Sequence, residues 1–446
     1  MKWQQLISNK RLGQEYRQPK RHDDRSEFKR DYDRLIFSAP FRRLQNKTQV
    51  FPLPGSIFVH NRLTHSLEVA SVGKSLGDDV ARILQRQHPD DESYQRLSDI
   101  GTIVSAACLA HDMGNPPFGH SGEKAIQAFF KEGPGSSLQA DVEPAFWEDI
   151  THFEGNANAF RLLTHQFKGR RPGGFVMTYS TLASIVKYPY ASSAAGQKGK
   201  FGFFCFEQDN FVRMAEEMGL IRLSANDQPL RYCRHPLVYL VEAADDICYE
   251  IMDIEDACKL KILSDEHAQQ LLLNFFDDEV KAQILQRIDE EQISDGNEKI
   301  AYMRASVIGL LEHECVTTFV EHEEDILNGT FQGGLIDYIS PTPLQAYATC
   351  VDFSKKNIYN SRPVLDVELS GYKIIETLMT HMTEAVLHPK RYYSTQLIER
   401  VSSQYDIHAD RLEERIMAVI DYVSGMTDVF ALDVYQKMNG ISLPIV

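Results

Sequence analysis

The segment AACLAHDMGNPPFGHSGEKA (106–125) ends an apolar run on two metal-type ligands, His111 and Asp112. A glycine, an asparagine and two prolines then interrupt the helical pattern, because proline removes a backbone donor and blocks the continuing helix. A second histidine–acid pair follows, His120 with Glu123, at a spacing that places both side chains on one helix face. The segment therefore indicates a buried helix ending at a polar site and a second helix beginning beside it.

Helical periodicity dominates the rest of the chain. Asn61 and Ser98 are capping-type residues before two of the apolar repeats, and Pro236 suits the first turn of a third. Two short β-type runs, FVMTYS (175–180) and KFGFFCF (200–206), favour a small hairpin. The predicted fold is mainly α, with helices over residues 61–87, 98–114, 235–260, 262–292, 297–326, 370–387, 394–405 and 408–438.

Composition is that of a globular protein, with 43% hydrophobic and 25% charged residues in a chain of 446. No run approaches the roughly 18 apolar residues of a membrane span, and the N-terminus carries no signal pattern, so we expect a cytoplasmic protein with no membrane contact. The segment NIYNSRPV (357–364) is interpreted as a junction, dividing a core of residues 1–356 from a helical C-terminal region of residues 357–446.

The charge is uneven along the chain. The formal net charge of −16 argues against a general nucleic-acid-binding surface. Residues 10–47 are nevertheless rich in Arg and Lys, which suits an anionic ligand and permits an accessory contact with single-stranded DNA. The same residues equally fit a solvated face with local salt bridges, and the sequence leaves both readings open.

Two further polar residues fall on apolar helix faces and extend the candidate metal site. His65 lies in NRLTHSLEV, and Asp245 lies in VEAADDICYEIMD. An unpaired carboxylate on a packed face is costly, and coordination to a cation removes that cost. The set His65, His111, Asp112 and Asp245 suits Mn²⁺, Fe²⁺, Mg²⁺ or Zn²⁺ and leaves positions open for water or phosphate. Taken singly, each residue also fits a satisfied core histidine or a helix-capping aspartate.

Five strings of the sequence form an ordered set of motifs: FRRLQNKTQVFP (41–52), NRLTHSLEV (61–69), HDMGNPPFGHSGE (111–123), FEGNA (153–157) and EAADDICY (242–249). In this order they resemble the motifs of the bacterial deoxyguanosine triphosphate triphosphohydrolases, which are HD-domain phosphohydrolases. Further toward the C-terminus the likeness is looser, in ELSGYKII (368–375) and SGMTDVFAL (424–432).

The resemblance implies an HD-domain helical core and hydrolysis of a dNTP, with dGTP preferred, to the deoxynucleoside and inorganic tripolyphosphate. It implies a divalent metal, Mg²⁺ or Mn²⁺, on the four ligands named above. His120 matches the family's catalytic histidine, and Glu123 would orient it. Whether His120 protonates the leaving 5′-oxygen or takes a proton from water stays open.

The substrate contacts are implied by the same resemblance. Arg62 matches a phosphate-binding arginine, and Lys187 and Lys200 resemble phosphate-facing lysines less closely, since each also fits a solvated loop charge. Tyr249 and Asp253 follow Asp245 at i+4 and i+8 on one helix face and match sugar-pocket residues. The remaining implied contacts are Gln49 with the sugar, and Asn156 and Glu368 with the base.

Family members form oligomers, so we expect a homo-oligomer, a hexamer or another even assembly, with the C-terminal region completing the pocket. Two alternatives remain. One is a different HD phosphohydrolase, such as a 5′-nucleotidase or a guanosine tetraphosphate hydrolase. The other is a nucleotide-sensing or single-stranded nucleic-acid-binding protein with secondary activity. The intact ligand set with His120 and Glu123 argues against a site that has lost its chemistry.

Overall fold

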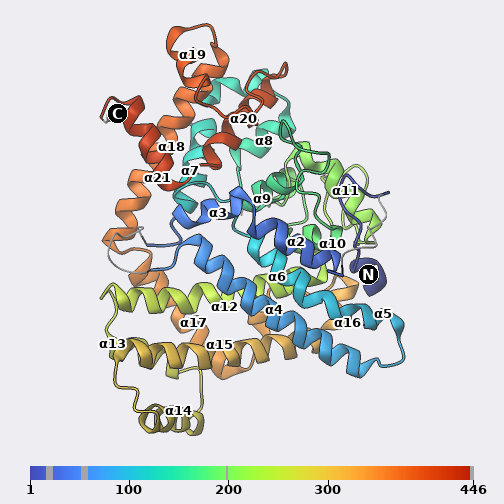
Figure 1. Ribbon diagram of the computed structural model, residues 1–446, viewed down its shortest axis with the longest axis vertical. Helices are drawn as coiled ribbons and strands as arrows, with labels where there is room; N and C mark the ends of the chain where they lie inside the picture. Colours follow the sequence, from blue (N-terminus) through green and yellow to red (C-terminus); the bar gives the residue numbers. More distant parts are fainter. Residues whose placement is uncertain (17–23, 52–58, 197–198, 442–446) are drawn as a thin grey trace.

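The computed structural model describes residues 1–16, 24–51, 59–196 and 199–441. Three parts of the sequence predictions lie outside the described residues: 17–23 of the basic segment, Pro52 of the first motif, and 197–198 beside the expected hairpin. Within the described residues the regular structure is helical, and β pairing is limited to isolated bridges (Figure 1). The mainly α prediction is therefore confirmed.

The α-helices are α1 (Trp3–Leu6), α2 (Glu27–Ile36), α3 (Ala39–Arg43), α4 (Arg62–Gln87), α5 (Glu92–Gln95), α6 (Ile100–Ala110), α7 (Gly119–Lys131), α8 (Pro144–Thr151), α9 (Gly155–Thr164), α10 (Tyr179–Ile185), α11 (Gln208–Glu217), α12 (Pro236–Lys259), α13 (Asp265–Leu273), α14 (Asp278–Glu290), α15 (Gly296–Glu321), α16 (Glu323–Asn328), α17 (Pro341–Phe353), α18 (Arg362–Leu387), α19 (Tyr392–Ile398), α20 (Leu412–Ser424) and α21 (Asp428–Met438). Short 3₁₀ segments and one π turn (Ser354–Ile358) connect them.

The two long helices that carry candidate ligands form where the sequence predicts them. α4 begins one residue after Asn61, whose side chain accepts a hydrogen bond from the Thr64 amide at 3.0 Å, while the Thr64 hydroxyl accepts one from the Asn61 amide at 3.1 Å. This capping box satisfies two amides that the first turn would otherwise leave unpaired. α12 begins at Pro236, which fits a first turn because no backbone donor is needed there.

The expected hairpin is wrong. Thr178 pairs with Arg11 rather than with residues 200–206. Its side chain accepts a hydrogen bond from the Thr181 amide at 3.3 Å, and this cap starts helix α10 inside the run read as a strand. Residues 200–206 form no strand and lead into a 3₁₀ turn. Their phenylalanines pack in the hydrophobic core, which explains why the run resembles a strand in the sequence.

Other helix boundaries also differ from the prediction. The ranges 262–292, 297–326 and 408–438 each divide into two helices, and α18 begins at Arg362, not at residue 370. Pro363 occupies the first turn of α18, where proline is tolerated, and residues 362–364 at the end of the expected junction belong to this helix.

Helices α4 and α6 approach closely enough to bring their ligands together. A Cβ added to Gly77 of α4 would lie 2.7 Å from the Cα of Gly101 in α6, closer than real side chains come. Glycine at both positions lets the two backbones touch. This close contact helps to set the position of α4, which carries His65, relative to α6, which ends just before His111.

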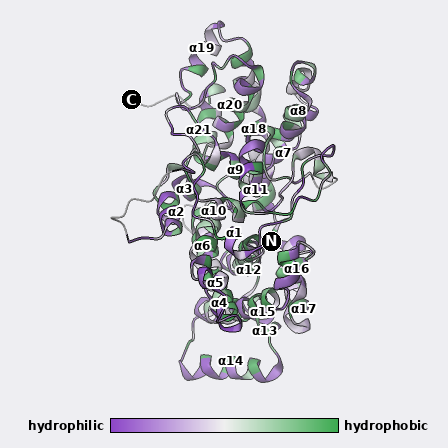
Figure 2. Cartoon of the chain, turned by 90° about the vertical axis from the view of Figure 1, so that its right-hand side faces the viewer, coloured by the Kyte–Doolittle hydropathy of each residue, from purple (hydrophilic) through white to green (hydrophobic). Residues whose placement is uncertain are grey.

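The helices gather into two hydrophobic cores. The first surrounds α4, α6, α12 and α15, and the second joins α7 and α8 to α18–α21. These groups lie in the lower and upper halves of Figure 1, and Figure 2 shows hydrophobic residues in both. No described helix is long and apolar enough to cross a membrane.

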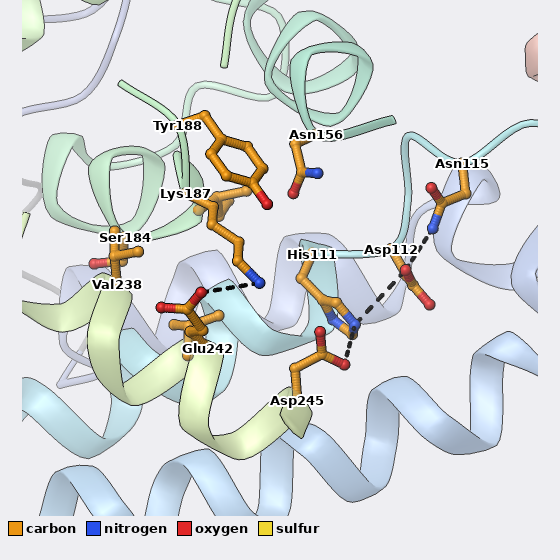
Figure 3. A pocket seen from close by; sticks show the side chains of 12 residues that line it. His111, Asp112, Asn115, Asn156, Ser184, Lys187, Tyr188, Val238, Glu242 and Asp245 are labelled. Atoms are coloured by element: carbon orange, nitrogen blue, oxygen red, sulfur yellow. Dashed lines mark hydrogen bonds and ion pairs between the residues drawn. The ribbon is translucent and has the colours of Figure 1, made fainter. Parts of the chain in front are cut away.

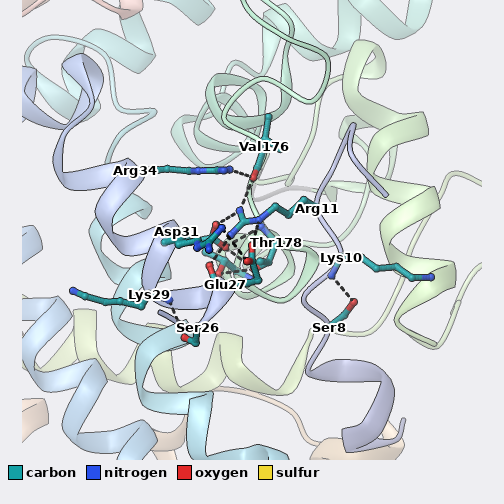
Figure 4. Close-up of polar contacts among 12 residues, drawn as sticks. Ser8, Lys10, Arg11, Ser26, Glu27, Lys29, Asp31, Arg34, Val176 and Thr178 are labelled. Carbon is teal, nitrogen blue, oxygen red and sulfur yellow. Dashed lines mark hydrogen bonds and ion pairs between the residues drawn. The ribbon is translucent and has the colours of Figure 1, made fainter. Parts of the chain in front are cut away.

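Part of the basic N-terminal segment is used in packing (Figure 4). Arg11 is buried, and its guanidinium pairs with Glu27 and Asp31 at 2.5 Å each and donates to the Val176 carbonyl at 2.7 Å. Arg34 donates to the same carbonyl. These two arginines hold the N-terminal chain against α10, so they fit the local salt-bridge reading rather than an exposed anion site.

Candidate metal centre and active site

Three helices bring the predicted ligands to one place. α4 supplies His65 one turn from its N-terminus, the turn that ends α6 supplies His111 and Asp112, and the middle of α12 supplies Asp245. Nε2 of His65 lies 3.0 Å and Nε2 of His111 lies 3.4 Å from the same oxygen, Oδ1 of Asp245. One ligand atom from each of these three residues lies within 4.8 Å of the others. This spacing fits a single divalent cation.

The orientation of His111 supports metal binding. Its Nδ1 lies 2.6 Å from the Cys108 carbonyl, which fixes that nitrogen as the N–H donor and leaves a lone pair on Nε2. Nε2 is buried and has no well-directed hydrogen bond among the described residues. A buried acceptor without a donor is costly, and a cation would satisfy it.

Asp112 stands beside this group with both oxygens engaged. Its Oδ1 lies 3.7 Å from Nε2 of His111 and accepts a hydrogen bond from the Asn115 side chain. Its Oδ2 accepts one from Arg62 at 2.7 Å. The structure thus brings His65, His111 and Asp245 together most tightly and places the fourth predicted ligand next to them, tied to the predicted phosphate-binding arginine.

The charges of the candidate ligands shift one another's pKa values. Burial opposes the ionisation of Asp245, but His111 and His65 hold the pKa of that carboxyl well below its usual range. Burial also opposes a charge on His111, but Asp112 and Asp245 outweigh it and raise its pKa to about 9. The carboxylates therefore stay ionised, and a metal would replace the proton that these acids favour on Nε2 of His111.

A cavity of about 130 Å³ opens over these ligands (Figure 3). His111, Asp112 and Asp245 line it, together with the predicted contacts Asn156 and Lys187. Figure 3 shows the Lys187 ammonium and the neighbouring Tyr188 hydroxyl pointing into the space above the ligands. Lys187 is paired there with Glu242 at 3.0 Å, a carboxylate that the sequence analysis did not single out.

The second histidine–acid pair lies on the first turn of α7. Nδ1 of His120 is 3.4 Å from Oε2 of Glu123; the His120 side chain is 64% exposed and the Glu123 side chain only 7%. The other oxygen of Glu123 accepts a hydrogen bond from the Gly155 amide at 2.8 Å. Burial opposes its charge, but His120, Lys200 and the Gly155 amide hold the Glu123 pKa below its usual value. His120 is not among the residues that line the cavity of Figure 3.

Lys200 lies between two buried carboxylates. Its ammonium is 2.6 Å from Oε1 of Glu154 and 3.7 Å from Oε2 of Glu123. Glu154 also caps α9 through the Asn156 and Ala157 amides. Lys200 thus lies beside the His120–Glu123 pair, and its charge is shared by the two buried carboxylates of Glu123 and Glu154.

The predicted sugar residues continue down α12. The Tyr249 ring lies 6.3 Å from the His65 ring and 6.1 Å from Tyr359 between centroids, and the Tyr359 hydroxyl donates to Asp253 at 2.8 Å. Tyr359 comes from the segment that the sequence marked as a junction. Gln49 has a buried Oε1 with no hydrogen-bond partner among the described residues.

Glu368 lies farther from the ligands. Its side chain is exposed on α18, and its carbonyl accepts a hydrogen bond at 2.6 Å from Ser121, the residue after His120. The backbone of α18 is therefore attached to the start of α7, whereas no described contact joins the Glu368 carboxylate to the ligand cluster.

One residue that supports the segments around the candidate site escaped the sequence analysis, although its motif SGMTDVFAL (424–432) was quoted. Asp428, at the start of α21, is buried and accepts hydrogen bonds from the Phe118 amide at 2.9 Å and the Thr48 amide at 2.8 Å. Phe118 has φ of 60° and immediately precedes α7, and Thr48 precedes Gln49. In the sequence, Asp428 looks like an ordinary acid in the first turn of a helix. Its partners Phe118 and Thr48 lie 310 and 380 residues away along the chain, so local spacing gives no sign of these contacts.

Lys47 reinforces the same connection. Its buried ammonium donates to the Ser424 carbonyl at 3.0 Å and to the Asn115 carbonyl. The loop between the metal ligands and His120 is therefore held from one side by Lys47 and from the other by Asp428. Both contacts tie this loop to α20 and α21.

Comparison with known proteins identifies the family of this chain. The family model described as HD domain matches residues 62–168, and the model described as phosphohydrolase-associated domain matches residues 339–437. A "Deoxyguanosinetriphosphate triphosphohydrolase-like protein" of Synechocystis is 38% identical over 99% of this chain and 100% of its own length. One of Pseudomonas aeruginosa is 35% identical over 100% of both chains. A "Deoxyguanosinetriphosphate triphosphohydrolase" of Yersinia enterocolitica is 28% identical over 92% of this chain and 93% of its own.

The matched HD region contains His65, His111 and Asp112, and the full-length relatives extend the likeness over the α12 ligand and the C-terminal helices. The chain therefore belongs to the deoxyguanosinetriphosphate triphosphohydrolase-like family of HD-domain phosphohydrolases.

Proposed function

We propose that this protein hydrolyses deoxynucleoside triphosphates, with dGTP preferred, to the deoxynucleoside and inorganic tripolyphosphate. The observation that carries the proposal is the convergence of His65, His111 and Asp245 beside the Asp112–Arg62 pair, under a cavity that Lys187 enters. Two imidazoles with carboxylates suit a hydrolytic metal, and flanking cations suit a phosphate chain. The names of the relatives support the same reaction class.

His65, His111, Asp112 and Asp245 would hold Mg²⁺ or Mn²⁺. When bound, the metal supplies a Lewis acid for the α-phosphate and lowers the pKa of the attacking water. Arg62 is already oriented by Asp112 and is buried, so it presents its charge to a phosphate without a large loss of side-chain freedom.

His120 moves the proton. Glu123 accepts a hydrogen bond from one ring nitrogen, which leaves the other nitrogen to serve the 5′-oxygen or the water. The buried, ionised Glu123 also stabilises the imidazolium that forms in either role. His120 is exposed at the start of α7, so we infer that it reaches the phosphate once substrate fills the space between α7 and the ligands.

The remaining contacts select the substrate. Lys187 and Lys200 bind the distal phosphates after exchanging their carboxylate partners. Tyr249 packs under the deoxyribose, Asp253 and Gln49 bind its polar atoms, and Asn156 and Glu368 lie toward the base. We further propose that residues 357–446 complete the pocket and support an even homo-oligomer, that the protein is cytoplasmic, and that the exposed part of the basic segment contacts single-stranded DNA.

A panel of the four dNTPs, supplied singly and in pairs with Mg²⁺ or Mn²⁺, tests the proposed activity. We expect dGTP to be consumed fastest and His111→Ala to lose both turnover and metal, measured by elemental analysis of the purified protein. Lys261→Ala, which removes an exposed cation just beyond the C-terminal end of α12, is the matched control and should retain both. Consumption of guanosine tetraphosphate or nucleoside monophosphates instead of dNTPs would reject the proposal.

A further inference from the structure

A second cavity adjoins the candidate active site. It measures about 720 Å³, and Lys187 and Tyr188 line both this cavity and the one over the metal ligands. Because these two consecutive residues belong to both linings, the two cavities adjoin at Lys187. We call this second space the cationic chamber, after its lining residues Lys187, Arg231 and Arg234.

The chamber differs from the active-site cavity in its charge. Its described lining includes the three cations just named and no carboxylate. The cavity over the ligands, by contrast, is lined by Asp112, Glu242 and Asp245. In a protein whose net charge is −16, a cavity of this kind attracts an anion against the general field.

Glu242 forms the partition between the two spaces. Its carboxylate pairs with Lys187 at 3.0 Å through one oxygen and with Arg234 at 2.7 Å through the other. Arg234 also donates to the Lys187 carbonyl at 3.0 Å. An anion with several phosphate oxygens can take over both cations from the single carboxylate, because each phosphate offers more acceptor atoms of the same charge type.

The chamber's aromatic side chains favour an anion without rings. The Arg231 guanidinium lies over the Tyr190 ring at 4.9 Å, and the Arg234 guanidinium lies over Tyr239 at 5.4 Å. Phe331 packs edge-on against Tyr239. These rings hold the arginines in place, so charged heads and hydroxyls, rather than open ring faces, remain to meet a ligand.

We propose that the cationic chamber binds linear inorganic polyphosphate and receives the tripolyphosphate released beside Lys187. The origin of this ligand rests on the proposed function, whereas the binding itself rests on the chamber's lining. Tripolyphosphate carries about four negative charges and would be held tightly by the active site, so a neighbouring cationic space gives it a path out. Arg231 lines the chamber and is exposed, so a ligand held there is in contact with solvent.

Isothermal titration of the metal-loaded, full-length protein with inorganic tripolyphosphate tests the chamber. Arg231→Ala should weaken binding about tenfold, the effect of losing one charge-assisted hydrogen bond. Arg222→Ala is the matched control, because Arg222 is an exposed arginine that pairs with Tyr232 in an isolated β-bridge and does not line the chamber. Its affinity should stay within about twofold of wild type, as expected for a screened surface charge.

The outcomes separate the chamber from the proposed reaction. Equal affinities for wild type and Arg231→Ala, or equal losses in the two arginine variants, would overturn the chamber even if dNTPs are hydrolysed to tripolyphosphate. An Arg231-dependent tripolyphosphate affinity in a protein that turns over no dNTP would retain the chamber and reject the function. If Arg231→Ala weakens a non-hydrolysable deoxynucleotide more than tripolyphosphate, the chamber is a nucleotide site and the proposal is wrong.

Discussion

Asp428, in the C-terminal helices, supports the segments around the candidate active site. Replacing it by Asn tests that support. Each Asp428 oxygen accepts one backbone hydrogen bond, from Phe118 at 2.9 Å and from Thr48 at 2.8 Å, and the side chain is buried. Asparagine keeps one acceptor oxygen but turns an NH₂ group toward the other amide. That amide then faces an NH₂ group instead of an oxygen, so its N–H has no acceptor.

The magnitude follows from that loss. An unsatisfied buried backbone donor costs about 1–3 kcal/mol, so we expect Asp428→Asn to lower the free energy of unfolding by this amount. The freed Phe118 immediately precedes the helix that carries His120. A displacement of roughly 1 Å in a reacting group can cost about a hundredfold in rate, so we expect kcat to fall at least about tenfold. Metal affinity should be unchanged, because no ligand lies on the freed segments.

Urea unfolding, steady-state hydrolysis of dGTP and metal titration measure these three quantities. Asp433→Asn is the control: it makes the same substitution in the same helix, at a half-exposed residue whose ion pair among the described residues is with Lys437. Its free energy of unfolding should change by less than about 0.5 kcal/mol. The reasoning is refuted if Asp428→Asn is no more destabilising than this control, or if its kcat is unchanged while stability falls.

Three further predictions concern single side chains. His120→Ala should lower kcat about 10²–10⁴-fold with metal content intact; a rate close to wild type would reject its proton-transfer role. Tyr249→Ala should relax discrimination against ribonucleotides, and an unchanged ratio of kcat/KM for dGTP and GTP would reject its contact with the sugar. Burial opposes a charge on His60, but hydrogen bonds to Asp256 and Glu68 outweigh it and raise its pKa to about 10. Because the folded pKa exceeds the unfolded value of about 6.5, this stabilisation is complete below that pH and is lost as pH rises through about 10. His60→Gln should therefore flatten the fall in unfolding free energy across that window, and an identical pH profile would contradict the assignment.

Local signals predicted the parts of the fold that local physics determines. Asn61 marked the start of α4, and Pro236 marked the start of α12, because a cap or a first-turn proline acts within one helical turn. The polar residues His65 and Asp245 were recognisable because each interrupts an apolar face. Their meeting at one point needed the full set of motifs, since spacing along separate helices does not fix distances between them.

The rest depended on contacts that no local pattern encodes. The run at 175–180 has β-type residues, yet the Thr178 cap and its pairing with Arg11 turn it into the start of α10. Tyr359 reaches Asp253 from a segment read as a junction. Asp428 acts on Phe118 across the chain, and only the folded structure shows that the C-terminal helices support the loop between the metal ligands and His120.

The products of dGTP hydrolysis in ¹⁸O-labelled water test the central claim most directly. Attack of water on the α-phosphorus breaks its bond to the 5′-oxygen, so the account predicts deoxyguanosine without label and tripolyphosphate carrying one ¹⁸O atom, observed by ³¹P NMR and mass spectrometry. Release of pyrophosphate or orthophosphate, or label in the deoxyguanosine 5′-hydroxyl, would contradict it.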